Sequence, residues 1–291
     1  MPQKVAVVTG SNTGIGLAMV RALCKHFGEN GVVYLTARNE ERGMQAVEVL
    51  KKEGLNPRFH LLDVNDVTSM EKLRDDIKTE HGGVDILINN AGILSKFDIP
   101  MYEQAVEMTN TNYHGVLLMT NTFLPIIRDG GRVVQLASLM GARTFYDISE
   151  ELQHRFRDVS TVEEVTGLMN EYIKATKEGD FKTKGWAELA YGISKIGVAA
   201  LTKVQGENVS KDKSKKDVLI NCCCPGYIRT NMTATHTGED TKSMISQDQG
   251  ADTPVYLSLL PAGTNDLQGK FVTKRMVKNY FKDDIRPVTF E

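Results

Sequence analysis

The sequence has few of the features that mark secreted, metal-binding or nucleic-acid-binding proteins. Its four cysteines include three consecutive ones at positions 222–224 and no CxxC pair, so neither a disulfide framework nor a zinc site is expected. The six histidines are scattered and form no HExxH motif, so no metal ion is expected. Lys and Arg number 35 against 37 Asp and Glu, and without a basic excess no nucleic-acid partner is expected.

Long apolar runs are also missing. None approaches the roughly 18 residues that cross a bilayer, so we expect no membrane association. The N-terminus, MPQKVAVV, passes directly into an apolar strand without the apolar core or cleavage site of a signal peptide. The sequence therefore predicts a soluble, cytoplasmic protein of a reducing compartment.

What the chain does contain is an alternation of short β-branched runs with longer stretches of helical period. At roughly 100–200 residues per domain, its 291 residues allow one large domain or two small ones. Strands are predicted at residues 5–8, 32–36, 58–62, 86–88, 132–136, 218–222 and 270–273. Helices are predicted at residues 16–26, 40–53, 67–80 and 195–210. Buried strands alternating with helices predict a single α/β domain over residues 1–291, a Rossmann-type doubly wound parallel sheet of about seven strands.

One stretch, residues 144–186, interrupts the alternation. Ser149 is a candidate N-cap followed by two acids, and Thr161 with Glu164 fits a capping box. After it, apolar residues recur at helical spacing, at positions 162, 165, 168, 169, 172 and 173. We interpret this stretch as a helical insertion packed on the main domain.

Two polar stretches are predicted to be loops. Residues 211–216 form a charged run before a strand, which is typical of a solvated connection. Residues 233–253 are rich in threonine and poorly periodic, which predicts a mobile loop.

A glycine-rich turn, TGSNTGIG at residues 9–16, lies directly between the first strand and the first helix. Such glycines let the backbone turn sharply and approach a pyrophosphate, while the helix N-terminus offers free N–H groups to the anion. A plain tight turn is the alternative, but the strand–turn–helix context favours dinucleotide binding. The residues expected to contact the cofactor here are Gly10, Asn12, Thr13, Gly14, Ile15 and Gly16.

The second strand ends in Ala37-Arg38, 22 residues after Gly16. An NAD-binding protein would place Asp or Glu near this position to hold the ribose 2′-OH. The Arg38 guanidinium instead suits a 2′-phosphate, which predicts NADPH/NADP⁺ as the cofactor; a surface arginine opening the next helix is the alternative.

Other candidate cofactor contacts follow the third and fourth strands. Asp63 and Val64 come after the third strand, where they could reach the adenine, and the small residues Asn90, Ala91 and Gly92 close the fourth. All lie at the carboxyl edge of the predicted sheet, where ligands of such folds bind.

Tyr191 and Lys195 form a YxxxK pair, and their spacing of four places them on one helix face. A free tyrosine has a pKa of about 10, which a neighbouring ammonium and the positive ring of an oxidised nicotinamide would lower. We predict that Tyr191 gives a proton to the oxygen of a carbonyl as hydride reaches its carbon, and that Lys195 also bonds the nicotinamide ribose. Ser138, after the fifth strand, would hydrogen-bond that oxygen.

With TGSNTGIG, NNAG, Ser138 and YGISK in order, the chain resembles the short-chain dehydrogenase/reductase family over nearly its whole length. The resemblance implies an Asn–Ser–Tyr–Lys tetrad, in which Asn112 would hold a water linked to the lysine; a helix-kinking or capping asparagine is the alternative. It also implies that the CPGYIRT segment contacts the nicotinamide. The residues carried over there are Pro225, Gly226, Ile228 and Thr230.

Family members usually separate the serine from the tyrosine by about a dozen residues, an expectation from the resemblance, whereas Ser138 and Tyr191 are 53 apart. The insertion fills that gap, as in the monomeric, NADPH-dependent carbonyl reductases of animals, which the chain most resembles. The insertion would cover the surface that other members use to form tetramers, so a monomer is expected. Thr13 stands where that group often has Lys, and Tyr227 where it often has Trp.

The predicted function is NADPH-dependent reduction of aldehyde, ketone or quinone carbonyls to alcohols. Ser138, Met140, Tyr191 and Tyr227 are the predicted substrate contacts, although Met140 could equally be a core residue. Two alternatives stay open: a dehydrogenase for a specific alcohol, steroid or prostaglandin, and a non-catalytic NADPH-sensing regulator. By the same resemblance, glutathione adducts are candidate substrates.

For glutathione adducts, Cys224, Gln104 and Lys96 are the residues that could contribute to binding. A purely structural role for the Cys224 thiol is the alternative, because buried free cysteines often behave as small hydrophobic residues.

Overall fold

A computed structural model of the chain describes residues 3–96, 98–233, 238–264 and 266–282. Its centre is one eight-stranded sheet in the order β3-β2-β1-β4-β5-β6-β7-β8, in which every pairing is parallel except β7 with β8. The strands are β1 (Lys4–Val8), β2 (Gly31–Ala37), β3 (Arg58–Leu61), β4 (Val84–Asn89), β5 (Ile127–Leu136), β6 (Leu219–Cys224), β7 (Phe271–Thr273) and β8 (Met276–Lys278). This order confirms the predicted Rossmann-type α/β fold.

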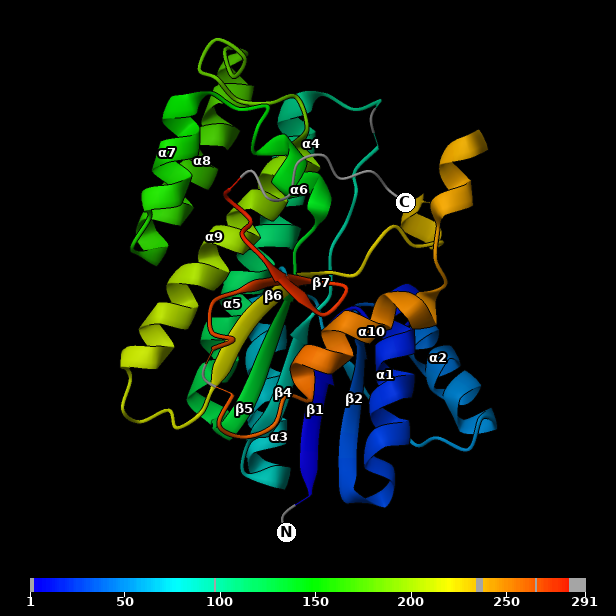
Figure 1. Cartoon of the computed structure of the whole chain (residues 1–291). Helices are drawn as coiled ribbons and strands as arrows, with labels where there is room; N and C mark the ends of the chain where they lie inside the picture. Colours follow the sequence, from blue (N-terminus) through cyan, green and yellow to red (C-terminus); the bar gives the residue numbers. More distant parts are fainter. Residues whose placement is uncertain (1–2, 97, 234–237, 265, 283–291) are drawn as a thin grey trace.

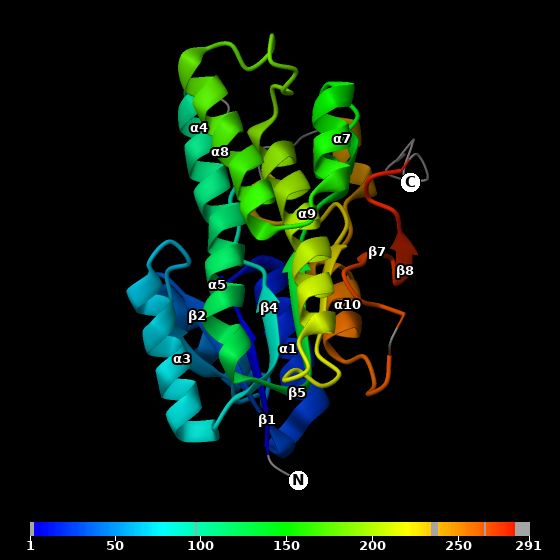
Figure 2. The same ribbon diagram turned by 90° about the vertical axis from the view of Figure 1, so that its left-hand side faces the viewer.

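Helices cover both faces of the sheet (Figures 1 and 2). The α-helices are α1 (Gly14–Phe27), α2 (Glu40–Lys52), α3 (Val67–His81), α4 (Met101–Met108), α5 (Gly115–Phe123), α6 (Leu139–Thr144), α7 (Glu150–Asp158), α8 (Val162–Glu178), α9 (Ala190–Lys211) and α10 (Gln247–Ser258). Short 3₁₀ turns are η1 (Gly28–Asn30), η3 (Leu124–Ile126), η4 (Asn231–Thr233) and η5 (Gly238–Ser243), and η2 (Thr109–His114) is π-helical.

The core consists of two apolar layers, one on each face of the sheet. Side chains of α1, α2 and α10 pack on one face. Side chains of α3, α5 and α9 pack on the other face. Because helices cover both faces, the central strands bury residues on both sides, and their sequences are therefore continuous apolar runs. The carboxyl ends of the strands point toward α4, α7 and α8, which stand above them in Figure 1.

The helical insertion is confirmed as α7 and α8. Ser149 caps α7 by accepting a hydrogen bond from the Leu152 N–H, and Thr161 and Glu164 form the predicted capping box at the start of α8. The apolar face of α8 packs on α9, where the Met169 side chain lies against Gly197. Any Cβ at position 197 would lie 2.6 Å from the Met169 sulfur, so the glycine allows the two helices to approach closely.

The eighth strand was not predicted. The β7–β8 hairpin turns through Lys274 and Arg275, whose φ angles are 49° and 60°. Two positive φ angles are what a type I′ hairpin turn requires, but Asn-Gly or Asp-Gly usually supplies them. The Lys-Arg pair carries no such signal, which explains why the sequence did not reveal this strand.

The prediction of a loop over residues 233–253 was wrong at its C-terminal end. Helix α10 begins at Gln247, and Ser246 with Gln249 forms a capping box that had not been recognised. The residues that α10 buries are mostly small or polar, such as Gly250, Thr253 and Ser258, so the sequence shows little apolar periodicity there. Residues 234–237 of that stretch lie outside the described residues.

No helix in the described part of the chain combines the length and apolar character needed to span a bilayer.

Candidate active site

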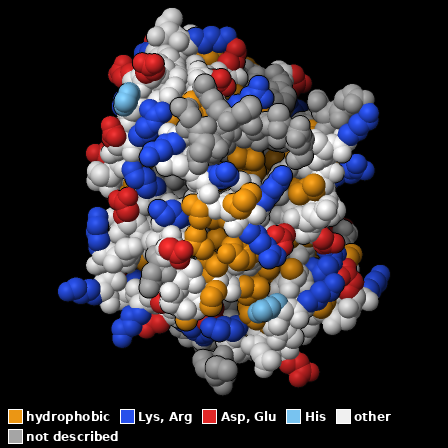
Figure 3. Space-filling view, viewed as in Figure 1, with side chains coloured by type: hydrophobic (Ala, Val, Ile, Leu, Met, Phe, Trp, Pro, Cys, Tyr) orange, Lys and Arg blue, Asp and Glu red, His pale blue; other side chains and the backbone are white. Residues whose placement is uncertain are grey.

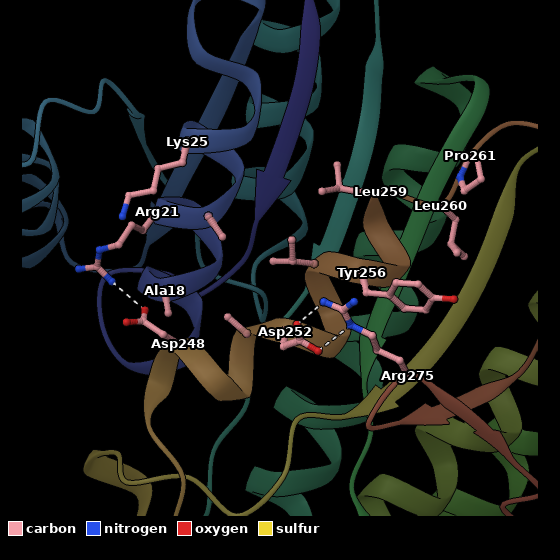
Figure 4. A pocket seen from close by; sticks show the side chains of 13 residues that line it. Ala18, Arg21, Lys25, Asp248, Asp252, Tyr256, Leu259, Leu260, Pro261 and Arg275 are labelled. Carbon is pink, nitrogen blue, oxygen red and sulfur yellow. Dashed lines mark hydrogen bonds and ion pairs between the residues drawn. The ribbon is translucent and has the colours of Figure 1, made fainter.

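Two hollows in the described part of the chain are candidate sites. One, of about 480 Å³, lies between α1 and α10 (Figure 4), on the face where Figure 3 shows hydrophobic side chains gathered over α10. Four of its charged residues form ion pairs: Arg21 bonds Asp248 and also Glu53, which does not line the hollow, and Arg275 bonds Asp252. It contains none of the predicted acid–base groups.

The other hollow is a cleft of about 520 Å³ at the carboxyl edge of the sheet. It brings together side chains from ends of β1, β2, β4, β5 and β6 and from the start of α9. All predicted cofactor and substrate residues line it: Gly10, Asn12, Thr13, Gly14, Ile15, Gly16, Arg38, Asp63, Val64, Asn90, Ala91, Gly92, Ser138, Met140, Tyr191, Lys195, Pro225, Gly226, Tyr227, Ile228 and Thr230. Asn112 does not line the cleft, and neither do Lys96 and Gln104, the residues predicted to contribute to binding of glutathione adducts.

The glycine-rich turn forms one wall of this cleft. Gly10 and Gly14 have φ angles of 59° and 61°, which other residues rarely adopt. A Cβ at Gly16 would lie 2.7 Å from the Ser11 Cα, so the close crossing of the turn over the helix start also requires glycine. Thr13 is the N-cap of α1 but its side chain makes no capping hydrogen bond, so the first N–H groups of α1 are free to bind an anion.

Residues 89–92 hold this turn in place. The Asn90 side-chain amide donates to the carbonyl oxygens of Thr9 and Gly10, at 2.8 and 3.0 Å. In return, the Thr9 hydroxyl oxygen accepts hydrogen bonds from the backbone N–H groups of Asn90 and Ala91, each at 2.9 Å. These bonds connect the ends of β1 and β4 across the cleft floor.

The segment from the end of β2 to the first turn of α2 supplies two guanidinium groups to the cleft. Arg38 lies there as predicted, and Arg42, in the first turn of α2, also lines the cleft. Asn39 caps α2 by accepting a hydrogen bond from the Arg42 N–H at 2.9 Å, which sets where α2 begins. Arg42 was missed because its approach depends on how α2 leaves the sheet, although its spacing of four from Arg38 is a helical repeat.

Asp63 and Val64 follow the end of β3 and line the cleft as predicted. The Asp63 carboxylate accepts a hydrogen bond from the Asn65 N–H at 2.9 Å and thereby keeps the local turn. Val64 packs so closely on Gly115 that a Cβ there would lie 3.1 Å from it. Both contacts fix the backbone that forms this part of the wall.

Asn112 is fully buried in the π-helical turn η2, between α4 and α5. Its side-chain oxygen accepts from the Ile93 N–H at 2.8 Å, and its amide donates to the Ile93 carbonyl at 3.0 Å and to the Ser194 hydroxyl at 3.1 Å. The π-helical turn aims this amide at the loop after β4, as such turns often do at functional sites. The geometry excludes the simple capping alternative, because the partners lie on other elements.

Ser138 and Tyr191 meet on the wall of the cleft opposite the glycine-rich turn. Ser138 is the N-cap of α6 and its hydroxyl accepts from the Met140 N–H at 3.1 Å. The Ser138 side chain also hydrogen-bonds Tyr191, which lowers the pKa of the phenol. Burial has the larger effect and raises the pKa of Tyr191 to about 12. The expected fall in this pKa is therefore absent from the protein alone, because desolvation of the phenolate outweighs the favourable contacts.

The ammonium of Lys195 lies 5.6 Å from the centre of the Tyr191 ring and is almost completely buried. It donates to the Leu136 carbonyl at the end of β5, at 2.7 Å. Burial lowers the pKa of this lysine to about 8. The lysine therefore still carries its charge at neutral pH and faces the same space as the phenol.

The turn after β6 forms another wall of the cleft. Gly226 has a φ of 101° and its N–H donates to the Cys224 sulfur at 3.4 Å. Burial raises the pKa of the Cys224 thiol, so this cysteine is a neutral structural group in the turn. Thr230 reaches back to the start of α1, where a Cβ at Gly14 would lie 3.6 Å from its methyl group. The segment therefore faces the glycine-rich turn across the cleft.

Comparison with known proteins now decides the family. The family model described as short chain dehydrogenase matches residues 4–149. The chain is also 43% identical over 279 residues to a human protein named carbonyl reductase [NADPH] 1, covering 95% of this chain and 98% of that protein. The chain belongs to the short chain dehydrogenase family.

Other members agree with this assignment. The protein of the same name from Macaca fascicularis is 44% identical over 280 residues, with 95% of this chain and 98% of that protein covered. Among solved structures, salutaridine reductase from Papaver somniferum superposes with a TM-score of 0.79 at 29% identity, covering 92% of this chain and 99% of that one. Menthone neomenthol reductase from Mentha piperita gives 0.76 at 26% identity, covering 94% and 99%.

This short chain dehydrogenase also has apolar cleft residues that sequence reasoning missed. They line the cleft together with Ser138 and Tyr191 and are Ile93, Leu94, Leu139, Leu189 and Met232. Leu139 and Leu189 stand next to predicted elements of the site and could have been found by that adjacency. Met232 comes from η4 and has no comparable signal. Together with Met140 and Tyr227 they give the cleft a partly apolar lining.

Proposed function

We propose that this short chain dehydrogenase reduces aldehyde, ketone or quinone carbonyls to alcohols with NADPH. The observation that carries the proposal is the meeting of Ser138, Tyr191 and Lys195 on one wall of a cleft whose other wall is the glycine-rich turn. The relatives named NADPH-dependent carbonyl reductases support the reaction and the cofactor.

The residues present fit a dinucleotide phosphate. The crossing of Gly10 and Gly16 leaves no room for side chains, and the uncapped N–H groups of α1 suit a pyrophosphate. Arg38 and Arg42 supply two guanidinium groups for a 2′-phosphate, and the second compensates for threonine at position 13. Bound NADPH would supply the hydride to the carbonyl carbon.

The proton comes from the chain. With its pKa raised to about 12, Tyr191 keeps its phenolic proton at neutral pH and can donate it to the carbonyl oxygen as negative charge develops there. Ser138 donates a hydrogen bond to the same oxygen and orients it. The Lys195 ammonium stabilises the phenolate left behind, and Asn112 holds the loop that carries Ile93 and contacts Ser194 on the catalytic helix.

The apolar residues that line the cleft favour carbonyl compounds with apolar bodies. Oxidation of a specific alcohol, steroid or prostaglandin would use Tyr191, Ser138 and Lys195 in the reverse direction. Arg38 and Arg42 favour reduction only indirectly, because they select NADPH as the cofactor. A non-catalytic NADPH sensor has no need for a phenol and an ammonium buried together, so the geometry favours an enzyme.

For glutathione adducts, the predicted contact through Gln104 is not supported. This side chain is buried and its amide donates to the Ile99 carbonyl at 2.9 Å, and neither Gln104 nor Lys96 lines the cleft. A glutathione adduct would have to be bound by the apolar residues around Ser138 and by the turn at Tyr227.

We further propose one reductase domain spanning residues 1–291, acting as a monomer in the cytoplasm. One continuous sheet carries all the described helices, which supports a single domain. The insertion covers α9, which supports a monomer. Four free cysteines are consistent with a reducing compartment.

The test is a panel of carbonyl compounds containing a quinone, an aromatic aldehyde and an aliphatic ketone, followed by the absorbance of NADPH and then of NADH. We expect turnover with NADPH in preference to NADH. Tyr191→Phe should lower kcat by about 10²–10⁴-fold, because the proton donor is lost, while NADPH binding measured by fluorescence is retained.

The control is Tyr34→Phe, which removes a hydroxyl bonded to His81; neither residue lines the cleft, so this variant should leave kcat unchanged. Near-normal turnover by Tyr191→Phe would rule out the mechanism.

A further inference from the structure

The segment after β8 returns to the back of the active site. Tyr280 is 3% exposed, and its ring stands edge-on to Phe271 of β7, with the ring centroids 4.8 Å apart. The next residue, Phe281, packs on Phe145 at the end of α6, and its carbonyl accepts a hydrogen bond from the Arg157 side chain of α7 at 3.0 Å. The helical insertion and β7 therefore both hold this segment in place.

The Tyr280 hydroxyl donates a hydrogen bond to the backbone carbonyl of Ser138 at 3.0 Å. That carbonyl also accepts from the N–H groups of Gly141 and Ala142, at 3.1 and 3.3 Å, in the first turn of α6. Gly141 has no side chain at the place where the Tyr280 hydroxyl arrives, and a Cβ there would collide with that hydroxyl. The contact therefore depends on two residues: Tyr280 supplies the hydroxyl, and Gly141 leaves the space that the hydroxyl occupies.

The Ser138 carbonyl fixes the orientation of the Ser138 side chain. Ser138 has extended backbone angles, φ −162° and ψ 144°, as an N-cap residue should. Its hydroxyl can accept from the Met140 N–H and meet Tyr191 only while the carbonyl keeps its direction into α6. A third hydrogen bond from outside the helix holds that direction when the hydroxyl turns toward a substrate oxygen.

We propose that Tyr280 is a positioning residue, which holds the Ser138 peptide so that the serine hydroxyl is aimed at Tyr191 and the carbonyl oxygen of the substrate. The proposal rests on the proposed function and extends it to the C-terminal segment. Tyr280 does not touch the reacting atoms in this account; it acts through Ser138.

The experiment is a double-mutant cycle on the full chain, with single-turnover hydride transfer from NADPH to a quinone as the readout. Tyr280→Phe removes the hydroxyl and keeps the ring in its packing. We expect its rate to fall about three- to tenfold, as for one neutral hydrogen bond, with the dissociation constant of NADPH unchanged. In a Ser138→Ala background the same substitution should change the rate less than twofold, because the group it positions is gone.

Tyr34→Phe is the matched control, since Tyr34 is similarly buried and its hydroxyl is similarly bonded, at 2.9 Å to His81, but it has no contact with Ser138. It should leave the hydride-transfer rate unchanged in both backgrounds. Thermal unfolding of each variant checks that the fold is kept.

Two outcomes would overturn the positioning role: a wild-type rate in folded Tyr280→Phe, or an equal fold-loss with and without Ser138, which would indicate a general structural effect. Absence of hydride transfer in the unmodified chain would instead overturn the proposed function, and this inference with it.

Discussion

At the scale of single residues, burial raises the pKa of Tyr191 and lowers the pKa of Lys195. Both side chains lose water in the cleft wall, and loss of water disfavours the charged form of each. The pKa of the phenol rises to about 12 and that of the ammonium falls to about 8. The phenol therefore stays protonated at neutral pH, as a proton donor must, while the lysine is the group that titrates nearest the working range.

This shift predicts the pH dependence of reduction. Because the pKa of Lys195 is lowered to about 8, its ammonium is lost as pH rises through that value, well before an ordinary lysine would lose its proton. We expect kcat/KM for NADPH, which reports on the free enzyme, to decline as pH rises through about 8. A steady-state profile with a quinone as fixed substrate measures this.

Lys195→Arg is the companion variant. Arginine keeps its charge over this range, so the variant should be slower at neutral pH, through altered geometry, but should lack the decline. A wild-type profile that stays flat, or an arginine variant with the same midpoint, would show that another group titrates.

At the scale of elements, α6 and α9 meet so closely that glycines set their separation. The side chain of a residue at position 141 would lie 2.8 Å from the Lys195 Cβ and 3.0 Å from the Gly192 carbonyl. Gly192 in turn lies against the Thr144 side chain. The two helices that carry Ser138 and Tyr191 are thus placed relative to each other by the absence of side chains between them.

We therefore expect Gly141→Ala to lower the free energy of unfolding by about 1–3 kcal/mol, because the extra methyl group has no space. The matched variant is Gly167→Ala in the interior of α8, where a Cβ would meet nothing within 4 Å. It should raise the free energy of unfolding by about 0.5–1 kcal/mol through the lower backbone entropy of alanine. Urea unfolding measures both, and equal effects of the two substitutions would contradict this account.

At the scale of the whole molecule, the insertion determines which surface is left open. Helix α9 is buried on nearly all sides from Ala190 to Gly206. Side chains of α8 pack against the side of α9 that faces away from the sheet. A helix that buries residues on nearly all sides needs such a cover, either from its own chain or from a second copy. In this chain the cover is intramolecular.

The protein should therefore have the molar mass of a single chain, 32.3 kDa, in light scattering at micromolar concentration. A dimeric mass would contradict the proposed monomer, and the apolar surface over α10 would then be the candidate dimer interface. Val255→Glu, in the hollow of Figure 4, would then test that surface, because a charge in an apolar interface weakens association.

The sequence alone determined the features that depend on neighbours in the chain. Apolar periodicity located β1 to β7 and the main helices, because burial of one face or of a whole strand leaves a local pattern. The glycine-rich turn, Arg38 and the Tyr191–Lys195 pair could be found because their chemistry requires fixed spacings or fixed places at strand ends.

Only the tertiary structure decided the rest. Strand β8 depends on a turn with no residue signal, and Arg42 depends on the direction in which α2 leaves the sheet. The pKa shifts of Tyr191 and Lys195 depend on burial by several elements at once. The hydrogen bond from Tyr280 to Ser138 joins residues 142 positions apart, and no local pattern encodes a contact of that span.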